Sequence, residues 1–189
     1  MKQIKLTVPN NWNDITIQQY QKFMILMDSK KSERAKTMDL ISLFCKVPLK
    51  QLKQFAIGDL EKIGAILIKM TKEEPTDVKL TKHVDFKNDV YSVLPNMSKM
   101  TTGEFVDLET YCEDAIKNLH KIMSILYRKQ TDKVDRWGRY SVEEYDPTEE
   151  KERKMLGFPM GYALGILNFF FHLEKKLLTD SRNCLVKLT

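Results

Sequence analysis

The feature that most constrains this chain is a nearly uncharged run over residues 157–173, in a protein whose composition is 30% charged. Gly157, Gly161 and Gly165 recur within it at every fourth position, which places them on one face of a helix. Glycines at this spacing form a smooth groove that another backbone can approach closely. Pro159 suits the first turn of such a helix, because its missing N–H has no intrahelical partner there. The run therefore predicts a buried helix, with Gly161 and Gly165 against a close helix neighbour.

Two interpretations of this apolar run differ in where the helix lies. A membrane span needs about 20 apolar residues with few polar breaks. This run is shorter, contains Asn168 and His172, and has charged residues on both sides, at 151–154 and 174–176. These features favour a helix in a protein core or a subunit interface, and they predict no membrane contact.

The net charge of +5 is unevenly distributed along the 189 residues. Residues 1–72 contain thirteen Lys or Arg and six Asp or Glu, a balance of +7, whereas residues 73–189 contain eighteen and twenty, a balance of −2. A basic N-terminal part can face nucleic acid or an acidic protein, although solvated helix faces rich in lysine produce the same pattern. The three cysteines are far apart in the sequence, which argues for synthesis in a reducing compartment.

The first half of the chain has the pattern of a short strand followed by four helices. Polar and apolar residues alternate over residues 2–8, which predicts a half-buried N-terminal strand. Capping residues and apolar spacing then predict helices that begin near Thr16 (where Gln19 completes a capping box), Ser32, Pro48 and Asp59. The connections between these helices are short, which favours antiparallel packing of neighbours.

The next part of the chain is predicted to form a hairpin and a long helix. Residues 73–99 contain two short β patterns, and residues 87–89 between them have the composition of a turn. A helix is then capped by Thr101 or the next threonine and runs to about Tyr127, with a kink near residues 113–114.

A long polar loop over residues 128–150 separates that helix from the glycine-spaced run. Loops of this length in a compact domain are usually functional. Thr148 then caps a charged first turn that leads into the glycine-containing helix, and residues 179–189 form a tail. The predicted fold class is mainly α: one domain over residues 1–189, with a helical bundle around the glycine-spaced C-terminal helix.

The residue types that usually carry catalysis are scattered along the chain. His83, His120 and His172 lie on three separate predicted elements, and none has a carboxylate or cysteine at a metal-ligand spacing. The sequence also contains no glycine-rich phosphate-binding motif. We therefore expect a protein that is not an enzyme, with no cofactor and no metal ion.

The long loop contains the best candidate for an interaction site. Arg136, Trp137, Arg139 and Tyr140 combine guanidinium groups with aromatic rings within five positions. Such groups can stack on nucleobases or grip a protein partner. Both interpretations stay open at this point, and contact with a protein is the favoured one.

Several segments resemble small structural or assembly proteins of tailed bacteriophages, in particular those of crAss-like phages and their relatives. They are residues 8–20 (VPNNWNDITIQQY), residues 102–111 (TGEFVDLETY) with 118–128 (NLHKIMSILYR), and the glycine-spaced run that leads into Phe169, Phe170 and Phe171. These segments contain no catalytic motif, so the resemblance implies a class of role and no reaction.

The resemblance implies a virion protein that is made in the cytoplasm of the bacterial host. Its expected role is a ring or adaptor subunit that joins the portal of the head to the tail. The implied partners are copies of itself in a ring, the portal, and other tail or ring proteins. DNA in the channel is a further candidate partner for the basic N-terminal part. The alternative role is a tail assembly chaperone that is not retained in the virion.

Overall fold

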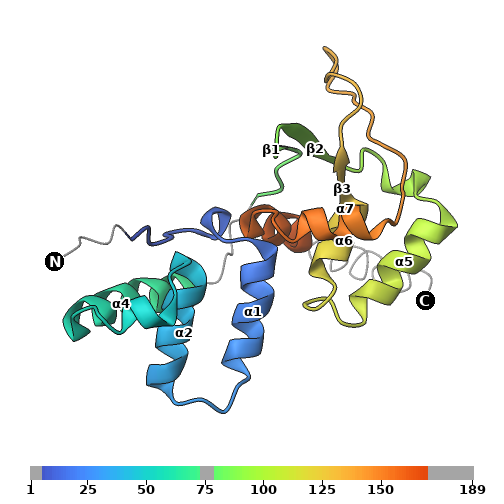
Figure 1. Cartoon of the computed structure of the whole chain (residues 1–189). Helices are drawn as coiled ribbons and strands as arrows, with labels where there is room; N and C mark the ends of the chain where they lie inside the picture. The colour runs from blue at the N-terminus through green and yellow to red at the C-terminus, as the bar shows by residue number, and fades with distance from the viewer. Residues whose placement is uncertain (1–5, 73–78, 170–189) are drawn as a thin grey trace, which may run out of the picture.

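The computed structural model describes residues 6–72 and 79–169. Its elements are η1 (Trp12–Asp14), α1 (Ile17–Met27), α2 (Glu33–Cys45), α3 (Leu49–Leu52), α4 (Ile57–Lys72), β1 (His83–Phe86), β2 (Asp89–Val93), η2 (Met97–Lys99), α5 (Thr102–Cys112), α6 (Leu119–Leu126), β3 (Tyr127–Lys129), α7 (Glu149–Met155) and a helix over residues 160–169. The chain is thus mainly helical with a small antiparallel sheet (Figure 1). This confirms the predicted mainly α class and the predicted hairpin.

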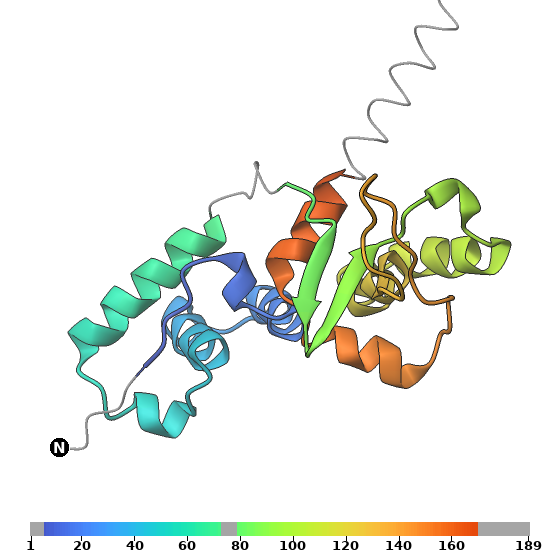
Figure 2. The same cartoon turned by 90° about the horizontal axis from the view of Figure 1, so that it is seen from above.

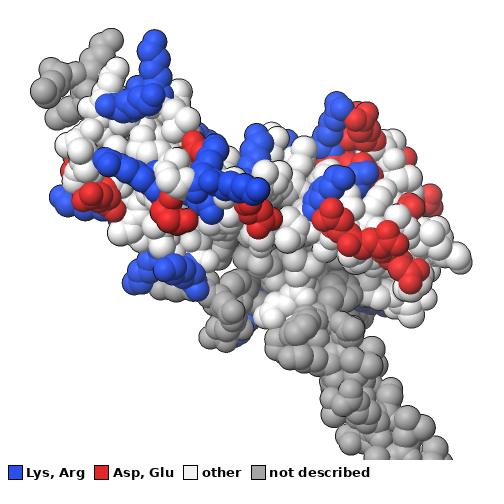
Figure 3. Space-filling view, turned by 90° about the horizontal axis from the view of Figure 1, so that it is seen from below, with Lys and Arg blue, Asp and Glu red and all other residues white. Residues whose placement is uncertain are grey.

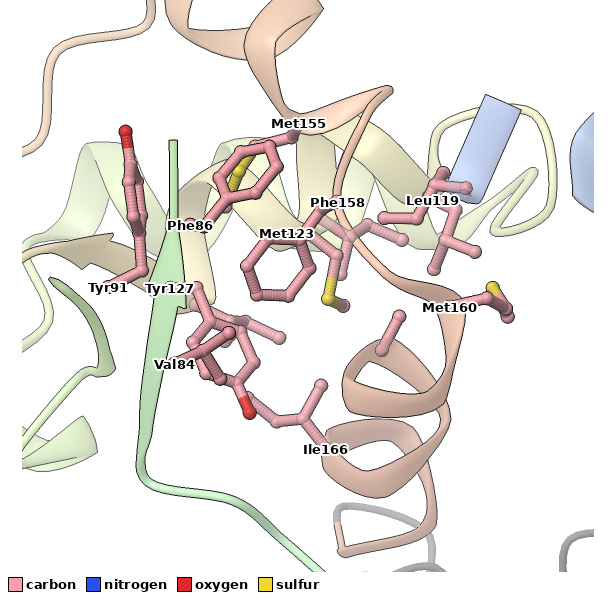
Figure 4. Packing of buried hydrophobic residues seen from close by; sticks show 14 of the residues in the cluster. Val84, Phe86, Tyr91, Leu119, Met123, Tyr127, Met155, Phe158, Met160 and Ile166 are labelled. Carbon is pink, nitrogen blue, oxygen red and sulfur yellow. The ribbon is translucent and has the colours of Figure 1, made fainter. Parts of the chain in front are cut away.

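Within residues 6–72 and 79–169, buried apolar side chains form two clusters, and the one in the second half also includes Ile17. The first cluster lies among α1 to α4 and includes Phe23, Ile41 and Leu67. The second lies between the sheet, α6, α7 and the helix over residues 160–169, and Phe158 packs there against rings from all three strands (Figure 4). The glycine-containing helix contributes to the second cluster, so two cores replace the single bundle that the sequence predicts.

The first turn of α1 connects the two halves. Every α-helix begins with four N–H groups that lack intrahelical partners. The capping box that the sequence predicts satisfies two of them, because Thr16 N–H donates to the Gln19 side chain and Gln19 N–H donates to the Thr16 hydroxyl. The other two belong to Ile17 and Gln18. They donate to the carbonyls of Phe158 and Leu156, at 3.0 and 2.9 Å, so the segment before the last helix completes the cap of α1.

The three strands form an antiparallel sheet in the order β1-β2-β3. Lys87 and Asn88 join β1 to β2, and both have positive φ angles, of 51° and 68°. This backbone is a type I′ turn, whose twist matches that of the strands it joins. The sequence predicts the turn but misses β3, because α6 continues into Tyr127 without any turn residue between them.

The long helix predicted over residues 101–127 is divided into α5 and α6. Turns over residues 113–118 separate the two helices. The side-chain amide of Gln21 on α1 donates to the carbonyls of Ile116 and Lys117, at 2.9 and 2.8 Å. A continuous helix would use these carbonyls for its own hydrogen bonds. The predicted kink is therefore a complete break, which a contact from a distant helix stabilises.

The helix that contains the glycines also differs from the prediction. α7 ends before the first glycine, and residues 156–159 turn before the helix over residues 160–169 begins. The proline of this turn contributes, because the residue before a proline avoids helical backbone angles. Gly157 therefore lies in the connection, and only Gly161 and Gly165 share a helix.

The predicted terminal features lie wholly or partly outside the described residues. Of the predicted strand over residues 2–8, residues 2–5 are not described, and residues 6–8 are not part of a strand. The predicted tail over residues 179–189 lies outside the described residues.

Candidate interaction surface

The predicted polar loop over residues 128–150 projects beyond the sheet (Figure 1). Its first two residues belong to β3, and the segments on either side of its tip are paired with each other. The backbone N–H of Thr131 donates to the carbonyl of Ser141 at 3.0 Å. That of Glu143 donates to the carbonyl of Lys129 at 2.9 Å. The loop therefore leaves and rejoins the fold as a paired ribbon.

Asp135 organises the tip of the loop. Its carboxylate accepts hydrogen bonds from the backbone N–H groups of Trp137 and Arg139, both at 2.8 Å. It also forms an ion pair with the Arg139 guanidinium, with 2.7 Å between Nε and Oδ2. Gly138 adopts a φ of 77°, which glycine tolerates and other residues rarely adopt. The hydrogen bonds from Arg139 and Trp137 lower the pKa of Asp135 below its ordinary value.

Trp137 is presented at this tip with 63% of its surface exposed. The guanidinium carbons of Arg136 and Arg139 lie 3.9 and 4.6 Å from the centroid of its ring, within the range of cation–π contacts. We call these three residues the Trp137 knob. Its ring already contacts two guanidinium groups of its own chain, which favours a protein contact over stacking on a nucleobase. Tryptophan and arginine are the side chains most enriched at energetic centres of protein interfaces.

Tyr140, the fourth residue of the predicted site, lies apart from the knob. Its hydroxyl donates to the carbonyl of Val93 at 2.8 Å, and its ring lies edge-on to His83 with 4.7 Å between centroids. Tyr140 therefore anchors the loop to the sheet. The prediction groups it with the knob because the four residues are close in sequence, but the turn at the tip sends it in another direction.

A buried ion pair also holds the loop, and the sequence reasoning misses it. Arg128 and Glu104 are only 7% and 4% exposed, and Nη2 lies 2.6 Å from Oε1. Nη2 is not aligned for a hydrogen bond with any described neighbour, so this contact is ionic in character. Arg128 also donates to the carbonyls of Ile125 and Glu143, at 3.0 and 3.4 Å, and its guanidinium lies 5.4 Å from the centroid of the Tyr145 ring. No pattern in the sequence indicates this pair, because it depends on how α5 packs against α6.

A cleft of about 400 Å³ lies between β3, α7 and the last part of the loop. Its lysines are paired with carboxylates. Asp89 lies 2.8 Å from Lys129 and 3.2 Å from Lys154, and these hydrogen bonds lower the pKa of Asp89. Lys151 lies 3.2 Å from Asp146. Because the chain's own carboxylates neutralise these cations, the cleft is poorly suited to an anionic ligand such as a phosphate.

The histidines singled out in the sequence make separate contacts. His83 Nδ1 lies 2.8 Å from the Ser92 hydroxyl, and His120 Nδ1 lies 3.2 Å from the amide of Gln21. His172 lies outside the described residues. Over residues 6–72 and 79–169, no group of three or more His, Cys, Asp or Glu side chains could hold a metal ion. Within the same ranges, no helix is long and apolar enough to cross a membrane.

The three predicted packing glycines occupy different environments. A Cβ atom on Gly161 would lie 2.1 Å from Oδ1 of Asn13, so its close neighbour is the short 3-10 helix η1 and not a long helix. Gly165 is buried in the same helix as Gly161. A Cβ on Gly157 would make only ordinary contacts, the nearest at 3.6 Å.

Gly64 on α4 lies close to a second α-helix. A Cβ atom there would lie 2.7 Å from Cγ2 of Thr37 on α2. The sequence reasoning does not single out this residue, because a lone glycine in an amphipathic helix carries no spacing signal. A close approach of two α-helices is therefore present in the N-terminal half, at a position outside the predicted glycine-spaced run.

Compared with protein-family models, curated proteins and solved structures, the chain gives no significant match. Its structural class is therefore defined by its own fold and surface. It is a mainly α protein with a small three-stranded sheet. A loop whose two sides are hydrogen-bonded to each other extends from this sheet and presents the cationic and aromatic Trp137 knob.

Proposed function

We propose that this protein is a non-enzymatic structural subunit of a tailed bacteriophage virion, a ring or adaptor protein that connects the portal to the tail. The Trp137 knob is the observation that carries the proposal. An exposed tryptophan is costly to leave in water, and here Asp135 and a paired ribbon hold it in place. A preorganised anchor of this kind loses little conformational entropy when it binds a neighbour. The resemblance of residues 8–20 and 102–111 to phage proteins supports the same role.

In this role, the two halves of the chain serve different contacts. The half built on the sheet and the glycine-containing helix presents the knob to the portal or to another tail or ring protein. The basic half, over residues 1–72, faces an acidic protein or DNA in the channel, because its balance of +7 attracts negative charge. The glycine-containing helix organises the knob-bearing half, since its buried side chains join the sheet to α6.

The test is quantitative mass spectrometry of purified virions from a phage that carries Trp137→Ala. We expect the wild-type protein in the virion and roughly tenfold or more loss of the variant, because truncation of an aromatic anchor costs on the order of 2 kcal/mol. Val134→Ala is the matched control, since Val134 is exposed on the same loop but outside the knob. Both variants should unfold at the wild-type temperature, because both side chains are exposed.

Absence of the wild-type protein from purified virions would contradict the proposal. It would favour the tail assembly chaperone, which binds another tail protein during assembly and then leaves. Equal incorporation of Trp137→Ala and Val134→Ala would show that the knob does not attach the protein to the virion.

A further inference from the structure

The helices α4 and α5 lie at opposite ends of the molecule (Figures 1 and 2), and both expose large apolar side chains. On α4, Ile57, Ile66 and Ile68 are 60%, 49% and 36% exposed. On α5, Phe105 and Val106 are 56% and 50% exposed. Helical spacing places Ile66 on the opposite side of α4 from Ile57 and Ile68, whereas Phe105 and Val106 are neighbours on α5. Large exposed apolar side chains commonly mark an interaction surface.

The charges around these two helices are opposite in sign. Residues 46–72 contain six lysines and two acidic residues, a balance of +4. Residues 102–118 contain five acidic residues and one lysine, a balance of −4. Basic side chains accordingly gather over the half that holds α4, and acidic side chains gather toward the α5 end (Figure 3).

Helical spacing interleaves the charges with the apolar side chains. On α4, Ile66 lies four residues after Lys62, an exposed lysine whose carboxylate partner is 3.9 Å away. On α5, Glu109 follows Phe105 by four residues, and Glu113 caps the C-terminal end of the helix; all three are exposed. Residues four apart share a helix face, so Ile66 lies beside a basic side chain and Phe105 lies beside an acidic one. We call the exposed surface around Ile66 the α4 face and the exposed surface around Phe105 the α5 face.

We infer that the α4 face of one copy binds the α5 face of the next copy. The second copy is the occupant because each chain carries both halves of a complementary pair. A two-fold contact of α5 with α5, or of α4 with α4, would instead place like charges opposite each other. A contact between two different faces is heterologous, and it generates a ring when the rotation between subunits closes. The ring geometry rests on the proposed function, whereas the contact itself is a property of the chain in solution.

The test mixes two variants, each with one face weakened. Phe105→Ala removes the anchor of the α5 face, and Ile66→Ala removes an anchor of the α4 face. Alanine favours helix and both side chains are exposed, so both variants should fold like the wild type. Ile25→Ala on α1 is the control, because Ile25 is 72% exposed but lies outside both faces. Sedimentation velocity over a range of concentrations measures the assembly of the full chain.

We expect the wild type and Ile25→Ala to form oligomers larger than dimers. Each face variant alone should associate with a Kd raised by roughly 30-fold or more. Their mixture should form one-to-one dimers near the wild-type Kd, because only one intact junction remains between the two chains. Raising the ionic strength should weaken association by screening the complementary charges.

Three results would overturn the inference. They are a wild-type chain that stays monomeric, face variants that assemble like the wild type, and a mixture that associates no better than its components. If both variants still formed rings, the contact between the α4 face and the α5 face would be ruled out, but the proposed role in the virion would still stand. If the protein were absent from virions, the proposed function would be contradicted, but a contact measured between copies in solution would still stand.

Discussion

Replacement of Gly161 by alanine tests how the two halves of the chain are joined. The added Cβ would lie 2.1 Å from Oδ1, 2.8 Å from Cγ and 3.2 Å from the backbone nitrogen of Asn13. The first two contacts can be relieved, because the Asn13 side chain is exposed and can rotate. The third involves the backbone of η1, whose neighbour Ile15 accepts a hydrogen bond of 2.7 Å from Met160. Moving η1 away therefore strains the junction itself.

The expected loss of stability is the difference between two effects. Overpacking of a close contact costs about 1–3 kcal/mol. Alanine gains up to about 1 kcal/mol over glycine in a helix, and less near the helix start. We therefore expect Gly161→Ala to lower the free energy of unfolding by about 1–2 kcal/mol. For a chain of this length that corresponds to a fall in Tm of about 2–8 °C.

The assay is thermal and chemical unfolding followed by circular dichroism. Gly103→Ala is the matched control, because a Cβ on Gly103 meets no atom within 4 Å. Asn13→Gly removes the atoms behind the two shortest contacts, so the double variant should recover about 1 kcal/mol of the loss. If Gly161→Ala is as stable as Gly103→Ala, or if Asn13→Gly restores nothing, the close contact at this junction is not what requires glycine.

Three further predictions concern the packing and titration of buried groups. Gly64→Ala should destabilise the protein by about 1–3 kcal/mol through its contact with Thr37, and Thr37→Ser should relieve part of the loss in urea unfolding. Glu104→Ala should lower the free energy of unfolding by about 3–5 kcal/mol, because it leaves the Arg128 charge buried without a partner. A loss below about 1 kcal/mol, as for a solvent-exposed ion pair, would contradict this prediction. Burial lowers the pKa of His120 from its ordinary 6.5, so below pH 6.5 the unfolded state binds more protons. Stability should therefore fall as the pH drops from 6.5 through the folded-state pKa, and His120→Gln should flatten that slope in unfolding curves.

Local signals in the sequence predicted much of the secondary structure. The capping box at Thr16, the cap at Ser32 and the turn at Lys87 and Asn88 all appear in the structure. Each depends on atoms within a few residues of one another, so the residue types present are sufficient to specify it. The charge imbalance between the two halves of the chain is likewise a property of the sequence alone.

The candidate site was predictable only in part. Arg136, Trp137 and Arg139 were recognised from their chemistry, and the structure brings their side chains together. The buried partnership of Glu104 with Arg128 was not predictable, since neither residue type nor spacing indicates which buried carboxylate meets which guanidinium. That choice follows from the packing of α5 against α6.

The sequence by itself determined where the capped helices α1, α2 and α5 begin, the turn of the hairpin, the sign of charge in each half, and the residues of the knob. Only the tertiary structure decided where the helices end and which backbone groups meet. The Gln21 side chain donates to two carbonyls at the break between α5 and α6. Two backbone N–H groups at the start of α1 donate to two more carbonyls, within residues 156–158. The physical reason is that each backbone carbonyl in these segments has both a local and a distant donor available. The apolar periodicity of the sequence indicates only the donor within the same helix, whereas tertiary packing brings the distant donor close enough to form the hydrogen bond.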